Sequence, residues 1–209
     1  MFLTTQRGAV LATFCSMMII GALRAPTGAA QSSALEEWNA FLTKPTTTTY
    51  GSLSRTIQAC VASKCSDDAV AGMENNFADF AKLLSLAERG NHLAMDLAFQ
   101  IRPLYKNAAE PSEDLDNSLG LSATRQPTFF LRLIRKYHVL PDEFQDMVVQ
   151  TSLKSVDNLR AQREELRNRI ESFSTVKDPT LLPLRQQAIS YVKNYIQQYS
   201  NLPDDAGGR

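Results

Sequence analysis

Histidine, cysteine and glycine are scarce in this 209-residue chain, which contains 2, 3 and 9 of them. The two histidines, His92 and His138, lack the H-E-x-x-H spacing that brings two imidazoles onto one helical face around a metal. The sequence has no G-x-S-x-G nucleophile elbow and no glycine-rich loop that could cradle a phosphate. It therefore predicts no catalytic residue, no cofactor-binding residue and no metal site.

An excess of one charge is also lacking, because 22 basic and 22 acidic side chains give a formal net charge of zero. Removal of residues 1–30 would take away Arg7 and Arg24 and no acid, which leaves 20 basic and 22 acidic side chains. This balance gives no electrostatic reason to expect nucleic acid or an anionic membrane as a partner. Another protein is the expected partner, and the oligomeric state is left open.

The N-terminus has the three parts of a secretory signal peptide. Arg7 precedes an uncharged run from Ala9 to Leu23, and small residues follow at Gly28 and Ala30. We expect cleavage between Ala30 and Gln31 and a periplasmic or secreted product without stable membrane insertion. The alternative is a retained anchor, although the run is shorter than the ~20 apolar residues that span a bilayer.

Two cysteines, Cys60 and Cys65, would remain after processing. An even pair in an oxidising compartment is normally bridged, so we expect one disulfide that closes a tight local loop. A redox or zinc site is the alternative, but C-x4-C is not the C-x-x-C of redox enzymes and no nearby histidine completes a zinc shell.

Strand signals are nearly absent, and apolar residues recur at helical spacing along most of the chain. Ser33 is expected to cap a short first helix that ends before Pro45, and Thr46 to Thr49 reads as an extended linker. Further helices are expected over residues 53–64, 67–89 and 91–105, and after Pro111, Pro127 and Pro141. The prediction is an all-α fold of antiparallel helical hairpins, a short α-solenoid or a bundle. Its divisions are a signal peptide (1–30), a short helix with its linker (31–50), a helical domain (51–202) and a flexible tail (203–209).

A long C-terminal helix pair is predicted after residue 155. The first helix has an apolar seam from Val156 to Phe173 that Arg163 interrupts. Its charged stretch from Arg160 to Arg169 favours a solvated face, with an anion or nucleic-acid surface as the alternative. The second helix carries a tyrosine stripe at a spacing of four residues. This stripe favours core packing, with a partner-binding edge as the alternative, and consists of Tyr191, Tyr195 and Tyr199.

Four acidic side chains lie close together in the middle of the sequence: Glu110, Glu113, Asp114 and Asp116. Metal binding or acid–base chemistry is one interpretation of this group. Capping and the helix dipole explain carboxylates at a helix start without any catalytic role, and we favour that explanation.

Three segments in the middle of the chain have the spacing and turn residues of helical hairpins. Leu83 to Tyr105 contains the turn Ala-Glu-Arg-Gly-Asn, and Ser112-Glu-Asp-Leu-Asp and then Gln126-Pro-Thr-Phe-Phe-Leu follow it. This stretch, about a third of the chain, resembles the HEAT-like helical hairpins of exported bacterial proteins that lack an assigned activity. The resemblance implies a binding scaffold and transfers no catalytic residue.

The sequence thus predicts an exported, non-catalytic helical protein that binds another protein in the periplasm or cell envelope. A specific version of this hypothesis is an immunity-type protein that occupies a toxin. One alternative is an envelope or polysaccharide-processing enzyme that uses the acidic group near Asp114. Another is a self-associating structural protein that uses the seam from Val156 to Phe173.

Overall fold

The computed structural model describes residues 27–63, 77–106, 109–152, 155 and 157–198, and the side chains of 27–34, 63, 77–79 and 109–110 lie outside this description. The described residues form nine α-helices and no strand, which confirms the all-α prediction. The helices are α1 (Thr27–Thr43), α2 (Thr47–Ser63), α4 (Phe77–Glu88), α5 (His92–Ile101), α6 (Ala109–Arg125), α7 (Pro127–Lys136), α8 (Pro141–Val149), α9 (Leu159–Ser174) and α10 (Leu182–Gln198). Two 3-10 turns join them, η1 (Arg102–Leu104) and η3 (Pro179–Leu181).

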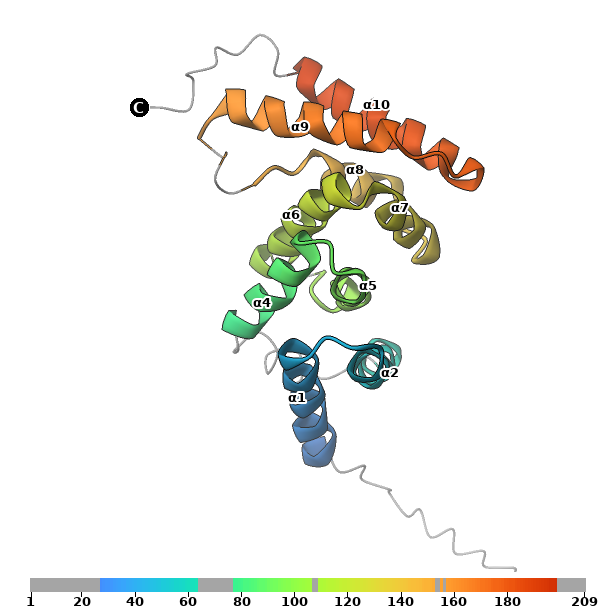
Figure 1. Ribbon diagram of the computed structural model, residues 1–209. Helices are drawn as coiled ribbons and strands as arrows, with labels where there is room; N and C mark the ends of the chain where they lie inside the picture. The colour runs from blue at the N-terminus through green and yellow to red at the C-terminus, as the bar shows by residue number, and fades with distance from the viewer. Residues whose placement is uncertain (1–26, 64–76, 107–108, 153–154, 156, 199–209) are drawn as a thin grey trace, which may run out of the picture.

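The helices are stacked in chain order, from α1 and α2 at one end to α9 and α10 at the other (Figure 1). α1 packs on α2, α4 on α5, and α10 runs back along α9. α6 is the central helix, because it contacts α4, α5, α7, α8 and α9. The predicted C-terminal helix pair is therefore present, and the assignment to a repeat solenoid stays a prediction.

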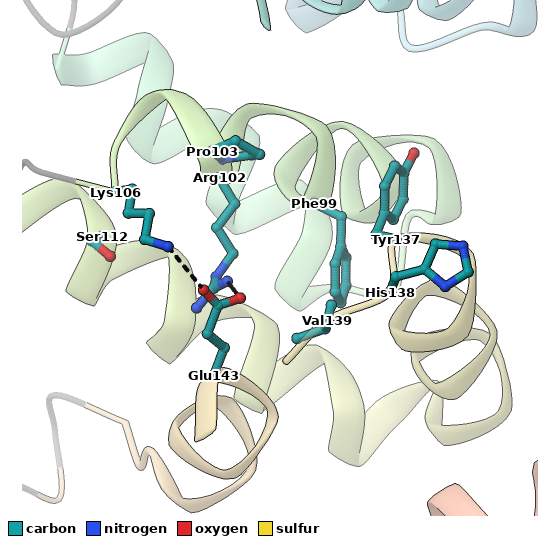
Figure 2. A pocket seen from close by; sticks show the side chains of 9 residues that line it. All are labelled: Phe99, Arg102, Pro103, Lys106, Ser112, Tyr137, His138, Val139 and Glu143. Carbon is teal, nitrogen blue, oxygen red and sulfur yellow. Dashed lines mark hydrogen bonds and ion pairs between the residues drawn. The ribbon is translucent and has the colours of Figure 1, made fainter. Parts of the chain in front are cut away.

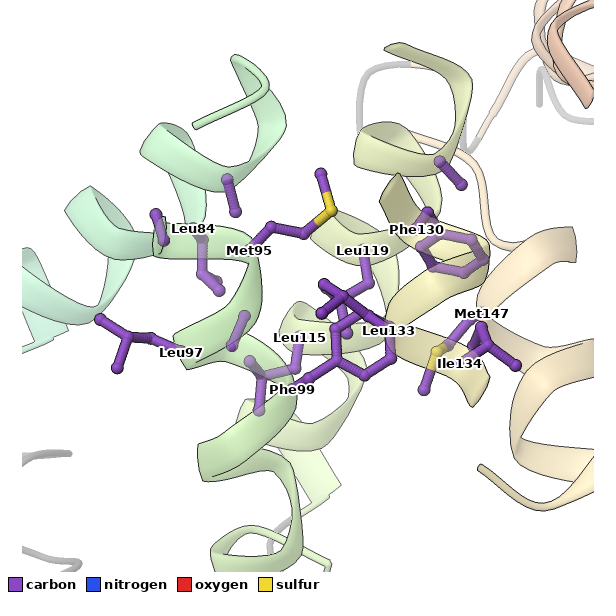
Figure 3. Packing of buried hydrophobic residues seen from close by; sticks show 14 of the residues in the cluster. Leu84, Met95, Leu97, Phe99, Leu115, Leu119, Phe130, Leu133, Ile134 and Met147 are labelled. Atoms are coloured by element: carbon purple, nitrogen blue, oxygen red, sulfur yellow. The ribbon is translucent and has the colours of Figure 1, made fainter. Parts of the chain in front are cut away.

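One apolar core runs through the stack. Figure 3 shows its middle part, where the labelled side chains come from α4 to α8. Its members face inward from every α-helix and include Trp38, Leu53, Leu83, Met95, Leu119, Phe130, Met147, Phe173 and Val192. Burial of one such side chain contributes about 1.5–3 kcal/mol to folding. This core holds the helix ends that form the pockets described below.

Several helix ends follow the signals in the sequence. Gly90 has a φ of 87° and closes α4 with two backbone hydrogen bonds, from the Gly90 N–H to the Ala87 carbonyl at 2.8 Å and from the Asn91 N–H to the Leu86 carbonyl at 3.0 Å. The Asn91 side chain then caps α5 by accepting the Ala94 N–H at 3.0 Å. Pro127 and Pro141 are the first residues of α7 and α8, as predicted.

The predicted extended linker over Thr46 to Thr49 is wrong, because α2 begins at Thr47. The two outer threonines cap it reciprocally. The Thr46 N–H donates to the Thr49 hydroxyl oxygen at 3.1 Å, and the Thr49 N–H donates to the Thr46 hydroxyl oxygen at 3.3 Å. These bonds satisfy backbone donors of the first turn and outweigh the weak helix propensity of β-branched residues.

Other helix starts also differ from the prediction, and α6 begins at Ala109 rather than at Pro111. α1 begins at Thr27 rather than after a Ser33 cap, in keeping with the high helix propensity of Ala29 and Ala30. α9 begins at Leu159, where the Asn158 side chain accepts the Ala161 N–H at 2.9 Å, and Val156 lies outside the described residues. None of the described helices combines the length and apolar character needed to cross a bilayer.

Candidate functional site

A pocket of about 230 Å³ lies where the end of α5 and η1 meet the start of α6 and the connection from α7 to α8 (Figure 2). We call it the Arg102 pocket. It is lined by Phe99, Arg102, Pro103, Lys106, Ser112, Tyr137, His138, Val139 and Glu143. Figure 2 shows charged side chains on one side of it and aromatic and apolar side chains on the other.

Arg102 organises the charged side of the pocket. Its Nε donates to Asp116 Oδ1 at 2.8 Å, its Nη1 donates to Glu143 Oε2 at 2.7 Å, and Lys106 Nζ lies 3.8 Å from Glu143 Oε1. Burial raises the pKa of the Asp116 carboxyl, and the charges of Asp146 and Glu143 act in the same direction, whereas Arg102 lowers it. Burial lowers the pKa of Arg102, but its two carboxylate partners outweigh this effect and raise the pKa overall. These charges therefore neutralise one another inside the protein.

A polar network centred on Asp96 lies behind the aromatic side. The Tyr137 hydroxyl and Lys136 Nζ donate to Asp96 Oδ1 at 2.9 and 2.8 Å. Gln100 Nε2 donates to Asp96 Oδ2 at 3.0 Å, and the Tyr50 hydroxyl donates to the same oxygen. Burial is the main reason that the pKa of Tyr137 rises well above its ordinary value, so its hydroxyl stays protonated. The network joins α2, α5 and α7 and fixes the Tyr137 ring, which stacks on Phe99 with centroids 5.8 Å apart.

The connection from α7 to α8 forms the rim of the pocket. His138 has a φ of 49° and ends α7 through bonds from the His138 N–H to the Arg135 carbonyl (3.3 Å) and from the Val139 N–H to the Ile134 carbonyl (3.2 Å). Glycine favours this left-handed position, so the histidine is strained there. The next residue, Leu140, is 53% exposed, which is the largest exposed fraction among the large apolar side chains described.

A second pocket, of about 160 Å³, lies between α6 and α9. We call it the Arg169 pocket. It is lined by Glu88, Leu121, Thr124, Arg125, Glu165, Asn168 and Arg169. Arg169 is completely buried, so the prediction that the whole charged stretch from Arg160 to Arg169 is solvated is wrong at this residue.

Arg169 clamps the end of α8. Its Nη1 donates to the backbone carbonyls of Val148 and Gln150 at 2.7 and 2.6 Å, and its Nε donates to the Thr124 hydroxyl oxygen at 3.0 Å. A guanidinium at the carboxyl end of a helix is favoured by the negative end of the helix dipole. Sequence reasoning missed this role, although Arg169 lies three residues after buried Leu166 and four before buried Phe173, on the same helical face.

The side chains of the acidic group near Asp114 that the structure describes differ in burial, and Asp114 itself is half-buried. Asp116 is buried and bound to Arg102, seven residues into α6, so capping does not explain it. Glu113 is exposed, and the side chain of Glu110 lies outside the described residues. No group of three or more His, Cys, Asp or Glu side chains within the described ranges could hold a metal ion.

The tyrosine stripe and the α9 seam pack against the core of the chain itself. Tyr191 and Tyr195 are half-buried, and the Tyr191 ring meets Phe144 edge-on with centroids 5.8 Å apart. Arg163 is also half-buried, while Leu166 and Phe173 of the seam are buried, so self-association through this seam would require these two side chains to become exposed. Tyr199 lies outside the described residues.

The residues predicted to form the disulfide and the cleavage site belong to the N-terminal part of the chain. Cys60 is buried close to the end of α2, and Cys65 lies outside the described residues, so the disulfide stays a prediction. Ala30 and Gln31 fall in the first turns of α1, and cleavage between them is likewise a prediction.

No protein-family model, curated protein or solved structure matches this chain.

Proposed function

We propose that the chain is an exported, non-catalytic helical protein that binds another protein in the periplasm or cell envelope, through the face formed by the Arg102 pocket and Leu140. The exposure of Leu140 beside this pocket carries the proposal. A partner that covers Leu140 removes its apolar area from water, and this burial contributes free energy to binding. An immunity-type protein that occupies a toxin is one specific form of this function.

The composition of the pocket supports a protein partner. Arg102 already holds two carboxylates, so the pocket has little unpaired charge with which to orient a small polar substrate. Its volume of about 230 Å³ is below the range of roughly 300–1,000 Å³ that is typical of small-molecule sites. A pocket of this size, with Phe99 and Val139 on its apolar side, suits a single side chain of a partner.

Two exposed leucines allow a controlled test. A photo-crosslinking residue is placed at Leu140 or at Leu182, which is 37% exposed and starts α10. We expect one protein to crosslink at position 140 in intact envelopes and not at position 182. Leu140→Asp should then abolish its capture while Leu182→Asp retains it. Equal crosslinking at both positions, or none at position 140, would overturn the proposed face.

Export is tested separately by sequencing the N-terminus of the protein purified from its natural host. Gln31 as the first residue in the periplasmic or secreted fraction supports the proposal. A cytoplasmic protein that begins at residue 1 would contradict it.

An envelope or polysaccharide-processing enzyme is the second candidate, and the raised pKa of Asp116 is the observation that favours it. Such an enzyme would hydrolyse envelope glycans, and Asp116→Asn would abolish the activity. Turnover that depends on Asp116 would replace the binding proposal, whereas turnover that the variant retains would point to a contaminating enzyme.

A further inference from the structure

One nitrogen of the Arg169 guanidinium has hydrogens for which the described residues provide no acceptor. Nε and Nη1 are bound to Thr124, Val148 and Gln150, whereas Nη2 is buried and has no hydrogen-bond partner among the described residues. Buried polar groups in proteins are nearly always paired, so an unpaired donor on a charged side chain requires an explanation.

The surrounding charges compensate Arg169 only in part. The end of α8 presents the equivalent of about half a negative charge, less than the full charge of a guanidinium. Glu165 acts on Arg169 through space, but its carboxylate accepts the backbone N–H and the hydroxyl of Ser152. Burial lowers the pKa of Arg169 to about 10, so the side chain is still charged at neutral pH.

Space for an additional group adjoins this side chain. The Arg169 pocket has a volume of about 160 Å³, whereas a water molecule takes about 30 Å³ of the liquid. Thr124 and Asn168 add polar groups to its wall, and Arg125 adds a second positive charge. Arg125 and Asn168 are exposed, so part of the pocket wall is in contact with solvent.

We propose that the Arg169 pocket binds a small oxyanion, a carboxylate or a phosphate, whose oxygen accepts the hydrogens of Arg169 Nη2. Charge-assisted bonds from a guanidinium to such oxygens are about twice as strong as those between neutral groups. Glu88 and Glu165 also line the pocket and repel an anion. Selection between anions therefore depends on whether an oxygen of the anion reaches the Nη2 hydrogens. A small, compact anion is favoured over a large, highly charged one.

The test uses sodium phosphate and sodium acetate, each titrated into the folded chain at constant ionic strength maintained with chloride. Binding is followed by the backbone amide resonances of the pocket residues in NMR spectra, which every variant retains, and by Tm. We expect a saturable shift with at least one of the two anions. Arg169→Met should weaken binding roughly tenfold or more, since a charge-assisted bond is lost. Arg167→Met, which removes an exposed arginine on the same helix, should leave it unchanged.

A second variant protects the test against misfolding of Arg169→Met. Leu121→Phe enlarges a half-buried side chain of the pocket wall and leaves Arg169 in place, so it should also weaken binding. Saturation by acetate alone identifies a carboxylate site, and saturation by phosphate alone identifies a phosphate site. The absence of a saturable shift in the wild type, or equal losses in the Arg167 and Arg169 variants, would overturn the proposal.

Discussion

Gly120 lies in the interior of α6 and faces the backbone at the end of α8. A Cβ atom added at Gly120 would lie 2.5 Å from the Met147 carbonyl oxygen and 3.3 Å from both Arg169 Nη1 and the Gln150 carbonyl oxygen. The closest of these atoms is a backbone oxygen of α8, one residue before the Val148 carbonyl that Arg169 binds, so it cannot move aside cheaply. Gly120→Ala is therefore expected to push α6 and α8 apart.

The size of the effect can be worked out with a second glycine as reference. Gly51 lies in the interior of α2, and a Cβ atom there would meet nothing within 4 Å. Gly51→Ala should stabilise the protein by up to about 1 kcal/mol through helix propensity alone. Gly120→Ala has the same gain in helix propensity, but overpacking costs about 1–3 kcal/mol. The free energy of unfolding should therefore fall by up to about 2 kcal/mol. The difference between the two variants, about 1–3 kcal/mol, measures the clash.

Urea-induced unfolding followed by far-UV circular dichroism gives both free energies of unfolding. The slope of the free energy against urea concentration should stay unchanged, so that the midpoints can be compared directly. Equal changes in stability for Gly51→Ala and Gly120→Ala would refute the close approach of α6 to α8.

Four other substitutions follow from the same geometry. Gly90→Ala should destabilise the protein by about 1–2 kcal/mol, because φ is positive at this position and alanine is strained there. His138→Gly should stabilise it by up to about 1 kcal/mol, because glycine tolerates the positive φ of position 138. Urea unfolding measures both changes. Tyr137→Phe removes a hydrogen bond to the carboxylate of Asp96 and should cost about 1.5 kcal/mol, measured as a loss of thermal stability. Burial raises the pKa of the Asp116 carboxyl, so the folded protein binds this proton more tightly than the unfolded chain does. The resulting contribution to the free energy of unfolding is lost as pH rises from about 3.9, the pKa in the unfolded chain, through the pKa in the folded protein. The stability advantage of the wild type over Asp116→Asn should therefore shrink across that pH window.

Each of these substitutions has an outcome that contradicts its premise. A neutral Gly90→Ala or a destabilising His138→Gly would show that the left-handed backbone carries no strain at that site. A Tyr137→Phe protein as stable as the wild type would mean that water replaces the hydroxyl. A stability difference for Asp116→Asn that grows with pH would reverse the sign of the pKa shift.

The sequence predicted the helix ends that short-range signals determine. Gly90 and Asn91 end one helix and start the next through bonds that reach no further than five residues. Pro127 and Pro141 open helices because proline lacks the N–H that a first turn leaves unpaired. Helix propensity alone does not predict a helix at Thr47, because the reciprocal capping bonds of Thr46 and Thr49 outweigh the weak propensity of β-branched residues.

The two pockets were beyond prediction from the sequence because their polar contacts join distant segments. Arg102 and Glu143 are 41 residues apart, and Arg169 is 45 residues from Thr124. A charged residue gives no sequence signal for its partner, and an arginine among other charges is usually solvated. Only the packing of α6 between its neighbours brings these groups together.

The clamp at Arg169 also bears on the order in which the protein folds. Its hydrogen bonds require α6, the end of α8 and α9 to be in place at the same time, since Thr124, Val148 and Gln150 are all acceptors. Until all three segments meet, the guanidinium stays in water, where it is well solvated. The C-terminal half should therefore assemble in one cooperative step, and its amide hydrogens should exchange with solvent as a single unit.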